Sequence, residues 1–330
     1  MARTVNEAFS EFMLKTVNVD KGMAEIACHS RDWLIDRIHS FNSIPDFPLL
    51  ANRFDLNFGS FNRNTKIIEI DDIDIIIGLD GSNAHYEEYG ENIQILVYQN
   101  NRLLLNLCHD FSNSLHSIKV LNKFTSNLNR IPQYQKSEIN RKQEAVVLNL
   151  SSYPWSFDIV PGFYTKPDQF GREYYLIPDG KGFWKKTDPR IDHRRLLTTN
   201  LRNKGYIFNI VKLMKYWNKR PTMPSMPQYL LECMILDYYT YQKSTKYLDL
   251  DVRNCLFYLS TAIKNTVMDP KGIQGDLNTI SSEDKLKISV RATVDCVRAQ
   301  EAYDYESSFD IYHAIKKWRE IFGNEFPVYS

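Results

Sequence analysis

The sequence is poor in the features that mark secreted, membrane-spanning and zinc-binding proteins. Its 330 residues hold only five cysteines, and none of them belongs to a Cys-x-x-Cys pair or a Cys/His cluster. A disulfide framework and a structural zinc site are therefore not indicated. No apolar run approaches the roughly 18 residues needed to span a bilayer, and the N-terminal segment carries no long apolar stretch. We expect a soluble cytoplasmic protein that does not bind membranes.

An excess of positive charge is also missing. The chain has 41 basic and 40 acidic side chains and a formal net charge of +1. A protein that binds a long nucleic acid neutralises many phosphates with its own cations. We therefore expect no long nucleic acid as a partner, although a local basic patch is compatible with this balance.

The content of apolar residues, 43% of the chain, is enough for a sizeable core, and the length favours two domains. Helical spacing of apolar residues predicts helices over 6–16, 23–41 and 103–124, and again from about residue 202 onwards. Strands are predicted over 53–58, 92–98, 145–150 and 156–160, and in the run that follows Asp72. Together these patterns indicate an α+β protein with a core at residues 1–200 and a helical domain at residues 201–330.

The stretch from Gly59 to Asp74, GSFNRNTKIIEIDDID, combines a Gly-Ser turn with an Asp-Ile-Asp triplet. Gly59 allows backbone conformations barred to other residues, and successive N–H groups in such a turn bind anions. In a strand, Asp72 and Asp74 share one face about 7 Å apart at Cα. We predict that Gly59 and Ser60 bind phosphate next to two metal-binding carboxylates. The alternative is an ordinary loop followed by solvated acids at a strand end.

A third acid, Asp158, lies in the predicted strand Phe157-Asp158-Ile159-Val160. An unpaired carboxylate among apolar neighbours is costly to bury, so this acid needs a partner. A metal ion shared with Asp72 and Asp74 would supply one, whereas the structural alternative is an acid that faces solvent just before Pro161.

These three acids, in this order after a Gly-Ser turn, resemble the nucleotidyltransferase superfamily of the DNA polymerase β type. Further sequence motifs resemble those of the bacterial cGAS/DncV-like nucleotidyltransferases, the signal-making enzymes of cyclic-oligonucleotide (CBASS) antiphage systems. They are GSF-x-R-x-T before D-I-D, then FDIVP, WKKTDP at 184–189, KLMKYWN at 212–218 and QYLLE at 228–232. The resemblance extends from about Phe9 into the C-terminal helices. It implies a mixed-sheet nucleotidyltransferase core, a C-terminal helical domain and an active site in the cleft between them.

The resemblance also implies two-metal phosphoryl transfer. Asp72 and Asp74 would bridge two Mg²⁺ ions, and Asp158 would hold the ion beside the acceptor hydroxyl and help to deprotonate it. Gly59 and Ser60 would bind the terminal phosphates of the donor nucleotide. Such a site needs no covalent nucleophile.

In the helical domain, the resemblance implies further contacts to the nucleotide. Lys215 falls where related enzymes place a triphosphate-binding lysine, and Lys212 is a weaker candidate of the same kind. Tyr229 matches an aromatic residue that stacks on the donor base, while Gln228 stands where a serine is often found. The alternatives are that both lysines are ordinary helix charges and that Tyr229 only fills the core.

The resulting hypothesis is a Mg²⁺-dependent synthase that joins ATP, GTP or other NTPs into a cyclic oligonucleotide and releases pyrophosphate. Family frequency favours purine substrates and a cyclic dinucleotide such as cGAMP, read by a downstream effector, with a regulatory protein as a possible partner. A linear-product enzyme, such as an oligoadenylate synthase or a tRNA nucleotidyltransferase, is one alternative. A catalytically silent nucleotide-binding or antitoxin module is another.

Overall fold

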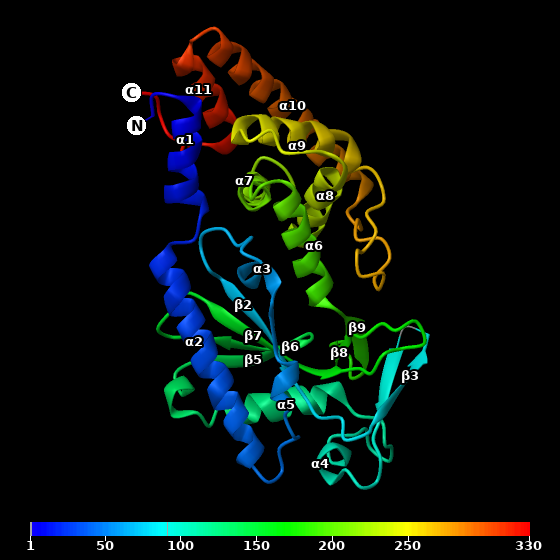
Figure 1. The fold of residues 1–330 in the computed structure, drawn as a ribbon. Coiled ribbons are helices and arrows are strands. Elements are labelled where there is room, and N and C mark those ends of the chain that lie inside the picture. Colours follow the sequence, from blue (N-terminus) through cyan, green and yellow to red (C-terminus); the bar gives the residue numbers. More distant parts are fainter. Residues whose placement is uncertain (1, 91) are drawn as a thin grey trace. The chain divides into compact units, whose positions relative to one another are not determined.

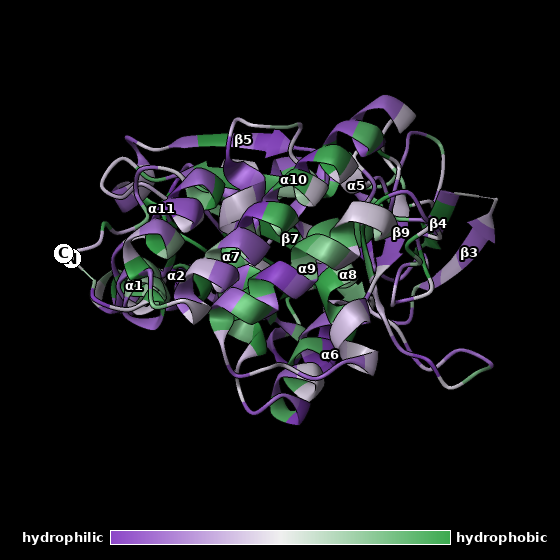
Figure 2. Cartoon of the chain, turned by 90° about the horizontal axis from the view of Figure 1, so that it is seen from above, coloured by the Kyte–Doolittle hydropathy of each residue, from purple (hydrophilic) through white to green (hydrophobic). Residues whose placement is uncertain are grey.

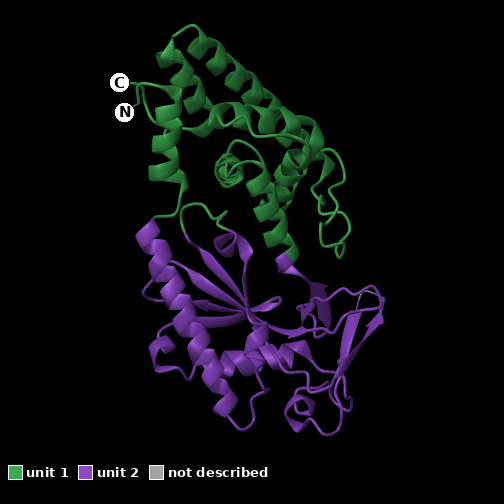
Figure 3. Cartoon of the chain, in the orientation of Figure 1, with its two compact units in different colours: residues 1–20, 64–69, 191–330 green, residues 21–63, 70–190 purple. Residues whose placement is uncertain are grey.

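The computed structural model describes residues 2–90 and 92–330 and shows an α+β chain (Figure 1). The chain forms two compact units (Figure 3). The sheet unit consists of Lys21–Arg63 and Ile70–Arg190, and the helical unit consists of Met1–Asp20, Asn64–Glu69 and Ile191–Ser330. The predicted α+β fold class is confirmed.

The sheet unit is built on one mixed sheet in the order β1-β2-β7-β8-β9-β4-β3, with β6 also paired to β7 and β5 to β6. The β2 and β7 strands run parallel, and the other pairs are antiparallel. The strands are β1 Leu56–Phe58, β2 Asp72–Gly78, β3 His85–Tyr89, β4 Asn92–Leu96, β5 Glu138–Lys142, β6 Ala145–Asn149, β7 Ser156–Tyr164, β8 Tyr175–Pro178 and β9 Trp184–Thr187.

Helices accompany this sheet: α2 Lys21–His39, α3 Gly59–Asn62, α4 Arg102–Leu105 and α5 Ser117–Leu128, with short 3-10 turns at Ser40–Ser43, Asn52–Phe54 and Pro132–Tyr134. The single helix predicted over 103–124 is wrong. Residues between α4 and α5 bond to the sheet instead, because Val97 N–H donates to the Asn113 carbonyl at 2.9 Å and Leu115 N–H to the Ile95 carbonyl at 2.8 Å. These backbone bonds satisfy groups that a continuous helix would have paired internally.

The helical unit contains α1 Val5–Phe12, a π-helical turn at Met13–Val17, α6 Pro189–Arg202, α7 Ile207–Lys219, α8 Gln228–Tyr241, α9 Leu248–Ala262, α10 Ser282–Ser307 and α11 Ile311–Phe322. Its core is one large apolar cluster to which α1, α7, α8, α9, α10 and α11 all contribute. Helix α8 is buried along most of its length, and Figure 2 shows the matching hydrophobic colouring on it. Within the described residues, no helix has both the length and the apolar character needed to cross a bilayer.

The units divide the chain differently from the predicted boundary at residue 200. The first twenty residues cluster with the C-terminal helices, because Phe9 packs edge-on against Trp318 with ring centroids 4.8 Å apart and Phe12 packs against Phe322 at 5.3 Å. The segment Asn64–Glu69 also clusters with them, although the sheet unit contains the residues on both sides of it. Contacts between residues far apart in the sequence therefore decide the division, and sequence position does not.

A buried acid on α10 gives a test of the helical unit's stability. Asp295, whose side chain is 0% exposed, accepts hydrogen bonds from Trp217 Nε1 at 2.9 Å, Arg291 Nε at 2.8 Å and Arg298 at 2.9 Å. We expect Asp295→Ala to lower the free energy of unfolding by about 3 kcal/mol, because it leaves a buried indole N–H without its acceptor and removes one carboxylate partner from each of two arginines. Urea denaturation followed by circular dichroism measures this. Asp304→Ala, at an exposed site on the same helix, should change it by less than about 0.5 kcal/mol. An equal effect of the two substitutions would contradict the role of Asp295.

Candidate active site

The three predicted acids lie on one face of the sheet. Along β2, burial alternates so that Ile73 and Ile75 are buried on one face while Asp72 and Asp74 lie on the other. In the parallel pairing of β2 with β7, Asp74 is the register partner of Asp158 and Asp72 that of Ser156. Register partners on neighbouring strands point to the same face, so Asp158 lies beside Asp74.

The same face becomes apolar farther along the strands. Ile76 on β2 and Val160 on β7, each two residues beyond an aspartate, belong to a small hydrophobic cluster together with Tyr175, Ile177 and Ala145. Phe58 on β1, the register partner of Asp74, packs against this cluster. The acids thus lie at one end of a packed face, which fixes the backbone that carries them.

Gly59 comes close to one of these carboxylates. It follows β1 directly, opens the short helix α3 and has φ +73. A Cβ atom at this position would meet Asp74 Oδ2 at 1.7 Å. Only glycine therefore allows the Gly59-Ser60 turn and Asp74 to approach this closely. The predicted phosphate-binding turn and the predicted metal-binding strand are adjacent.

The chemistry of the three aspartates suits Mg²⁺, which prefers carboxylate oxygen ligands. Within residues 2–90 and 92–330, however, no three acidic, histidine or cysteine side chains already form a compact metal-binding group. Three like-charged carboxylates repel each other, and a bound cation would offset this repulsion. The backbone register places the three aspartates on one face, and Mg²⁺ binding by them stays a prediction.

Lys215 is an internal partner of the segment 64–69. Its Nζ lies 2.7 Å from Glu232 Oε2 and 3.1 Å from the Thr65 hydroxyl, and the side chains of Lys215 and Glu232 are 1% and 2% exposed. Thr65 also donates to Glu232 at 2.9 Å. This buried network fastens Thr65 to α7 and α8 within the helical unit. The predicted triphosphate contact of Lys215 is not tested by this arrangement.

Lys212 lies one turn earlier on α7. Its Nζ donates to Asn18 Oδ1 and to Asn64 Oδ1, each at 3.2 Å. Burial, followed by the charge of Lys215, lowers the pKa of Lys212 from its usual value. These two partners are neutral amides, which do not neutralise the charge of Lys212. This suits attraction of an anion, and the phosphate role of Lys212 also stays a prediction.

Tyr229 sits in the first turn of α8 and is held by its hydroxyl group. The hydroxyl donates to Asp192 Oδ1 at 2.6 Å, and Lys271 Nζ donates to the same hydroxyl. Burial is the main cause that raises the pKa of Tyr229, followed by neighbouring groups that include Asp192. The tyrosine is therefore a neutral hydrogen-bond donor in a charged environment, and its predicted stacking role concerns the ring.

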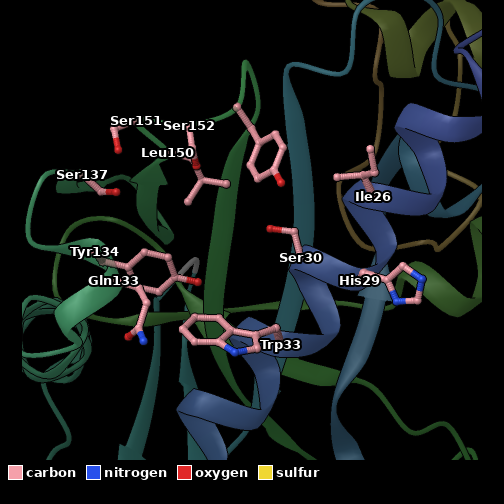
Figure 4. Close-up of a pocket in the computed structure, with 11 residues that line it drawn as sticks. Ile26, His29, Ser30, Trp33, Gln133, Tyr134, Ser137, Leu150, Ser151 and Ser152 are labelled. Atoms are coloured by element: carbon pink, nitrogen blue, oxygen red, sulfur yellow. The ribbon is translucent and has the colours of Figure 1, made fainter.

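The sheet unit also has a surface groove whose lining includes none of the predicted site residues (Figure 4). Its volume is about 340 Å³, and it is lined by one face of α2, by the turn at Gln133 and Tyr134, and by Leu150 to Tyr153. Ile26 and Trp33 are among its lining residues, and no lysine, arginine or acid lines it. The groove therefore offers no charge for a triphosphate and includes none of the predicted site residues.

Known proteins resemble this chain in sequence and in fold. No protein-family model matches the chain. A probable cyclic nucleotide synthase of Bacillus cereus (strain VD146) is 41% identical over 332 residues and is matched over 100% of both chains. The structure of E. coli MS115-1 CdnC with ATP is 14% identical, covers 98% of both chains and has a TM-score of 0.71; its complex with HORMA-deltaN has the same values. Vibrio cholerae DncV, a cyclic AMP-GMP synthase, has a TM-score of 0.56 over 83% of this chain and 69% of its own.

At this identity over its whole length, the chain belongs to the family of its Bacillus relative, the bacterial cGAS/DncV-like nucleotidyltransferases. It is thus an enzyme of the nucleotidyltransferase class, and the resemblance found in the sequence is confirmed. The nucleotidyltransferase fold is confirmed by the structural matches.

Sequence reasoning missed the polar partners of the helical unit. Glu232, Asp192, Asp269 and Lys271 each contact a predicted site residue or one of its partners. Glu232 carried a signal, because it is the one acid within the apolar run Leu230–Leu236 and therefore needs a buried partner. Lys271 lies in the loop between α9 and α10, where no periodicity points to a partner.

Proposed function

We propose that this enzyme joins NTPs into a cyclic oligonucleotide second messenger and releases pyrophosphate. The observation that carries the proposal is the register of Asp74 with Asp158, with Gly59 against Asp74. The name of the Bacillus relative supports a cyclic product. Purine substrates and a cyclic dinucleotide such as cGAMP are our first choice, and antiphage signalling through a downstream effector is the role that fits this product.

In this proposal Asp72, Asp74 and Asp158 hold two Mg²⁺ ions, which when bound neutralise charge on the transferred phosphoryl group. The backbone N–H groups of the Gly59-Ser60 turn and the Ser60 hydroxyl bind the donor's terminal phosphates. Asp158 accepts the proton of the attacking 3′- or 2′-hydroxyl. Lys215 and Lys212 attract the triphosphate, and the Tyr229 ring stacks on a base.

A regulatory protein partner is part of the proposal. Its support is that E. coli CdnC, the structural neighbour that matches 98% of the chain, is seen in complex with HORMA-deltaN. The fold alone is shared with that neighbour, which is 14% identical. A purified chain that is inactive by itself and gains activity with a co-purified partner would support this part separately.

Incubation with the four labelled NTPs and Mg²⁺, followed by phosphatase treatment and mass spectrometry, tests the proposed reaction. We expect a phosphatase-resistant product, because a closed ring has no terminal phosphate. Phosphatase-sensitive chains would identify a linear-product enzyme. Absence of turnover with every NTP combination, with and without a regulatory partner, would favour a silent nucleotide-binding module and contradict the proposal.

A further inference from the structure

Three charged side chains in the helical unit form a cluster around the hydroxyl of Tyr229, which lies on α8. They are Asp192 on α6, and Asp269 and Lys271 in the loop between α9 and α10. Lys271 Nζ lies 3.3 Å from Asp192 Oδ2 and 3.1 Å from Asp269 Oδ1. The side chains of Lys271, Asp192 and Asp269 are 5%, 10% and 0% exposed. Removing two acids and one lysine from water costs desolvation free energy, which is offset only when the contacts among them have good geometry. The positions of these side chains are therefore well defined.

The cluster touches one end of the tyrosine only. Lys271 Nζ lies 4.3 Å from the ring centroid of Tyr229 but bonds directly to the hydroxyl. Because the hydroxyl oxygen is itself nearly 3 Å from the ring centre by standard bond lengths, the ammonium lies beside the hydroxyl and not over the ring. Asp192 and, at 3.4 Å, Asp269 also contact the hydroxyl. Three charged groups therefore hold the tip of the side chain without covering its ring.

Lys271 is itself held in place by the loop. Asp269 accepts N–H bonds from Lys271 at 3.2 Å, Ile273 at 3.2 Å and Gln274 at 3.0 Å, which closes the loop into a tight turn. Burial acts to raise the pKa of Asp269, but these backbone bonds and Lys271 outweigh it and hold the pKa below its usual value. Asp269 is therefore ionised at neutral pH and keeps Lys271 pointing at the tyrosine.

We propose that Lys271, with Asp192 and Asp269, is a positioning group that fixes the Tyr229 ring as a rigid platform for the base of a bound nucleotide. This inference rests on the proposed function, in which Tyr229 stacks on a base. A ring that is already immobilised loses little conformational entropy when a base stacks on it, so the anchor strengthens binding without touching the nucleotide. The effect falls on substrate affinity and not on the phosphoryl-transfer step.

The alternative role of the cluster is purely structural, as a tether of the loop to α6 and α8. Tyr229→Phe separates the two roles. It keeps the ring and leaves the ion pairs of Lys271 with Asp192 and Asp269 in place, and it removes only the hydroxyl that couples them to the ring. Tyr239→Phe is the matched control, because Tyr239 lies on the same helix and also donates its hydroxyl to an acid, Asp251, at 3.2 Å. Tyr239 is 2% exposed and packs in the hydrophobic core of the helical unit.

The experiment uses the full chain and two readouts. In steady-state assays, we expect Tyr229→Phe to raise KM for the NTPs about tenfold, equivalent to about 1.4 kcal/mol of binding, with kcat within about twofold. In an Asp74→Asn background that prevents turnover, binding of 2-aminopurine riboside triphosphate should weaken by a similar factor, and its fluorescence quenching on the ring should decrease. Tyr239→Phe should lower Tm without moving either readout. Lys271→Gln should reproduce the affinity loss of Tyr229→Phe.

Unchanged analogue affinity and quenching in Tyr229→Phe would overturn the positioning role and leave the cluster as a tether. Failure of the proposed function looks different. In that case the wild-type chain makes no product from any NTP, whereas the analogue still binds and Tyr229→Phe still weakens it.

Discussion

Replacement of Asp72 and Asp74 by asparagine is expected to reduce product formation by at least about 10³-fold, equivalent to about 4 kcal/mol of transition-state stabilisation. The two carboxylates lie on the same face of the sheet as Asp158, and Asp74 also lies against Gly59. Asparagine keeps their size and some hydrogen bonding but removes the negative charge that attracts a divalent cation. Product is measured by mass spectrometry over a Mg²⁺ titration.

The fold should tolerate the change, because both positions lie at the partly exposed start of β2 and the buried isoleucines of that strand are untouched. Circular dichroism and the urea midpoint should stay close to wild type. Asp80→Asn is a suitable control, since it removes an exposed acid just beyond the same strand and should leave activity unchanged. Product formation by the double variant at more than about a tenth of the wild-type rate would refute the metal-binding assignment of these acids.

The Gly59→Ala variant is expected to lose activity by about 10²-fold or more. The added Cβ would lie 1.7 Å from Asp74 Oδ2, far inside van der Waals contact, so either the turn or the carboxylate has to move. A displacement of about 1 Å at reacting groups is enough for a loss of this size. Activity is measured under saturating NTP and Mg²⁺, so that a change in affinity does not mask a change in rate.

Gly171→Ala separates the collision from backbone strain. Gly171 has the same φ, +73, but nothing lies within 4 Å of its added Cβ. Both variants pay the cost of a left-handed alanine, on the order of 1 kcal/mol. Only Gly59→Ala also disturbs Asp74. Equal losses of activity in the two variants would show that strain alone matters and would remove the argument for a close approach of turn and carboxylate.

The strand that carries the acids could be predicted from local sequence, because the alternation of Asp72, Ile73, Asp74 and Ile75 encodes both faces. Its pairing could not. The register of Asp74 with Asp158 joins residues far apart in the chain, and only the cost of burying Asp158 unpaired and a family resemblance suggest that the two meet. The sequence predicts a turn at Gly59, whereas the close approach of Gly59 to Asp74 depends on three-dimensional packing.

The helical unit shows the limit of reading one helix at a time. The sequence indicates Lys215 as a triphosphate-binding lysine on its own helix. Its partner Glu232, however, belongs to the next helix, and its second partner, Thr65, belongs to a distant segment. The helix predicted over 103–124 failed for a similar reason. Residues there bond to the edge of β4, and apolar spacing in a single segment carries no information about such bonds.

The path of the chain has a practical consequence for dissecting the enzyme. The backbone passes from one compact unit to the other between residues 20 and 21, 63 and 64, 69 and 70, and 190 and 191. A gene fragment cut at residue 200 would therefore encode neither unit whole, since the helices after that point would lack the aromatic residues of α1 and the anchored Thr65. Split-protein reassembly should accordingly demand co-expression of both halves, and each half alone should be insoluble or readily digested by protease.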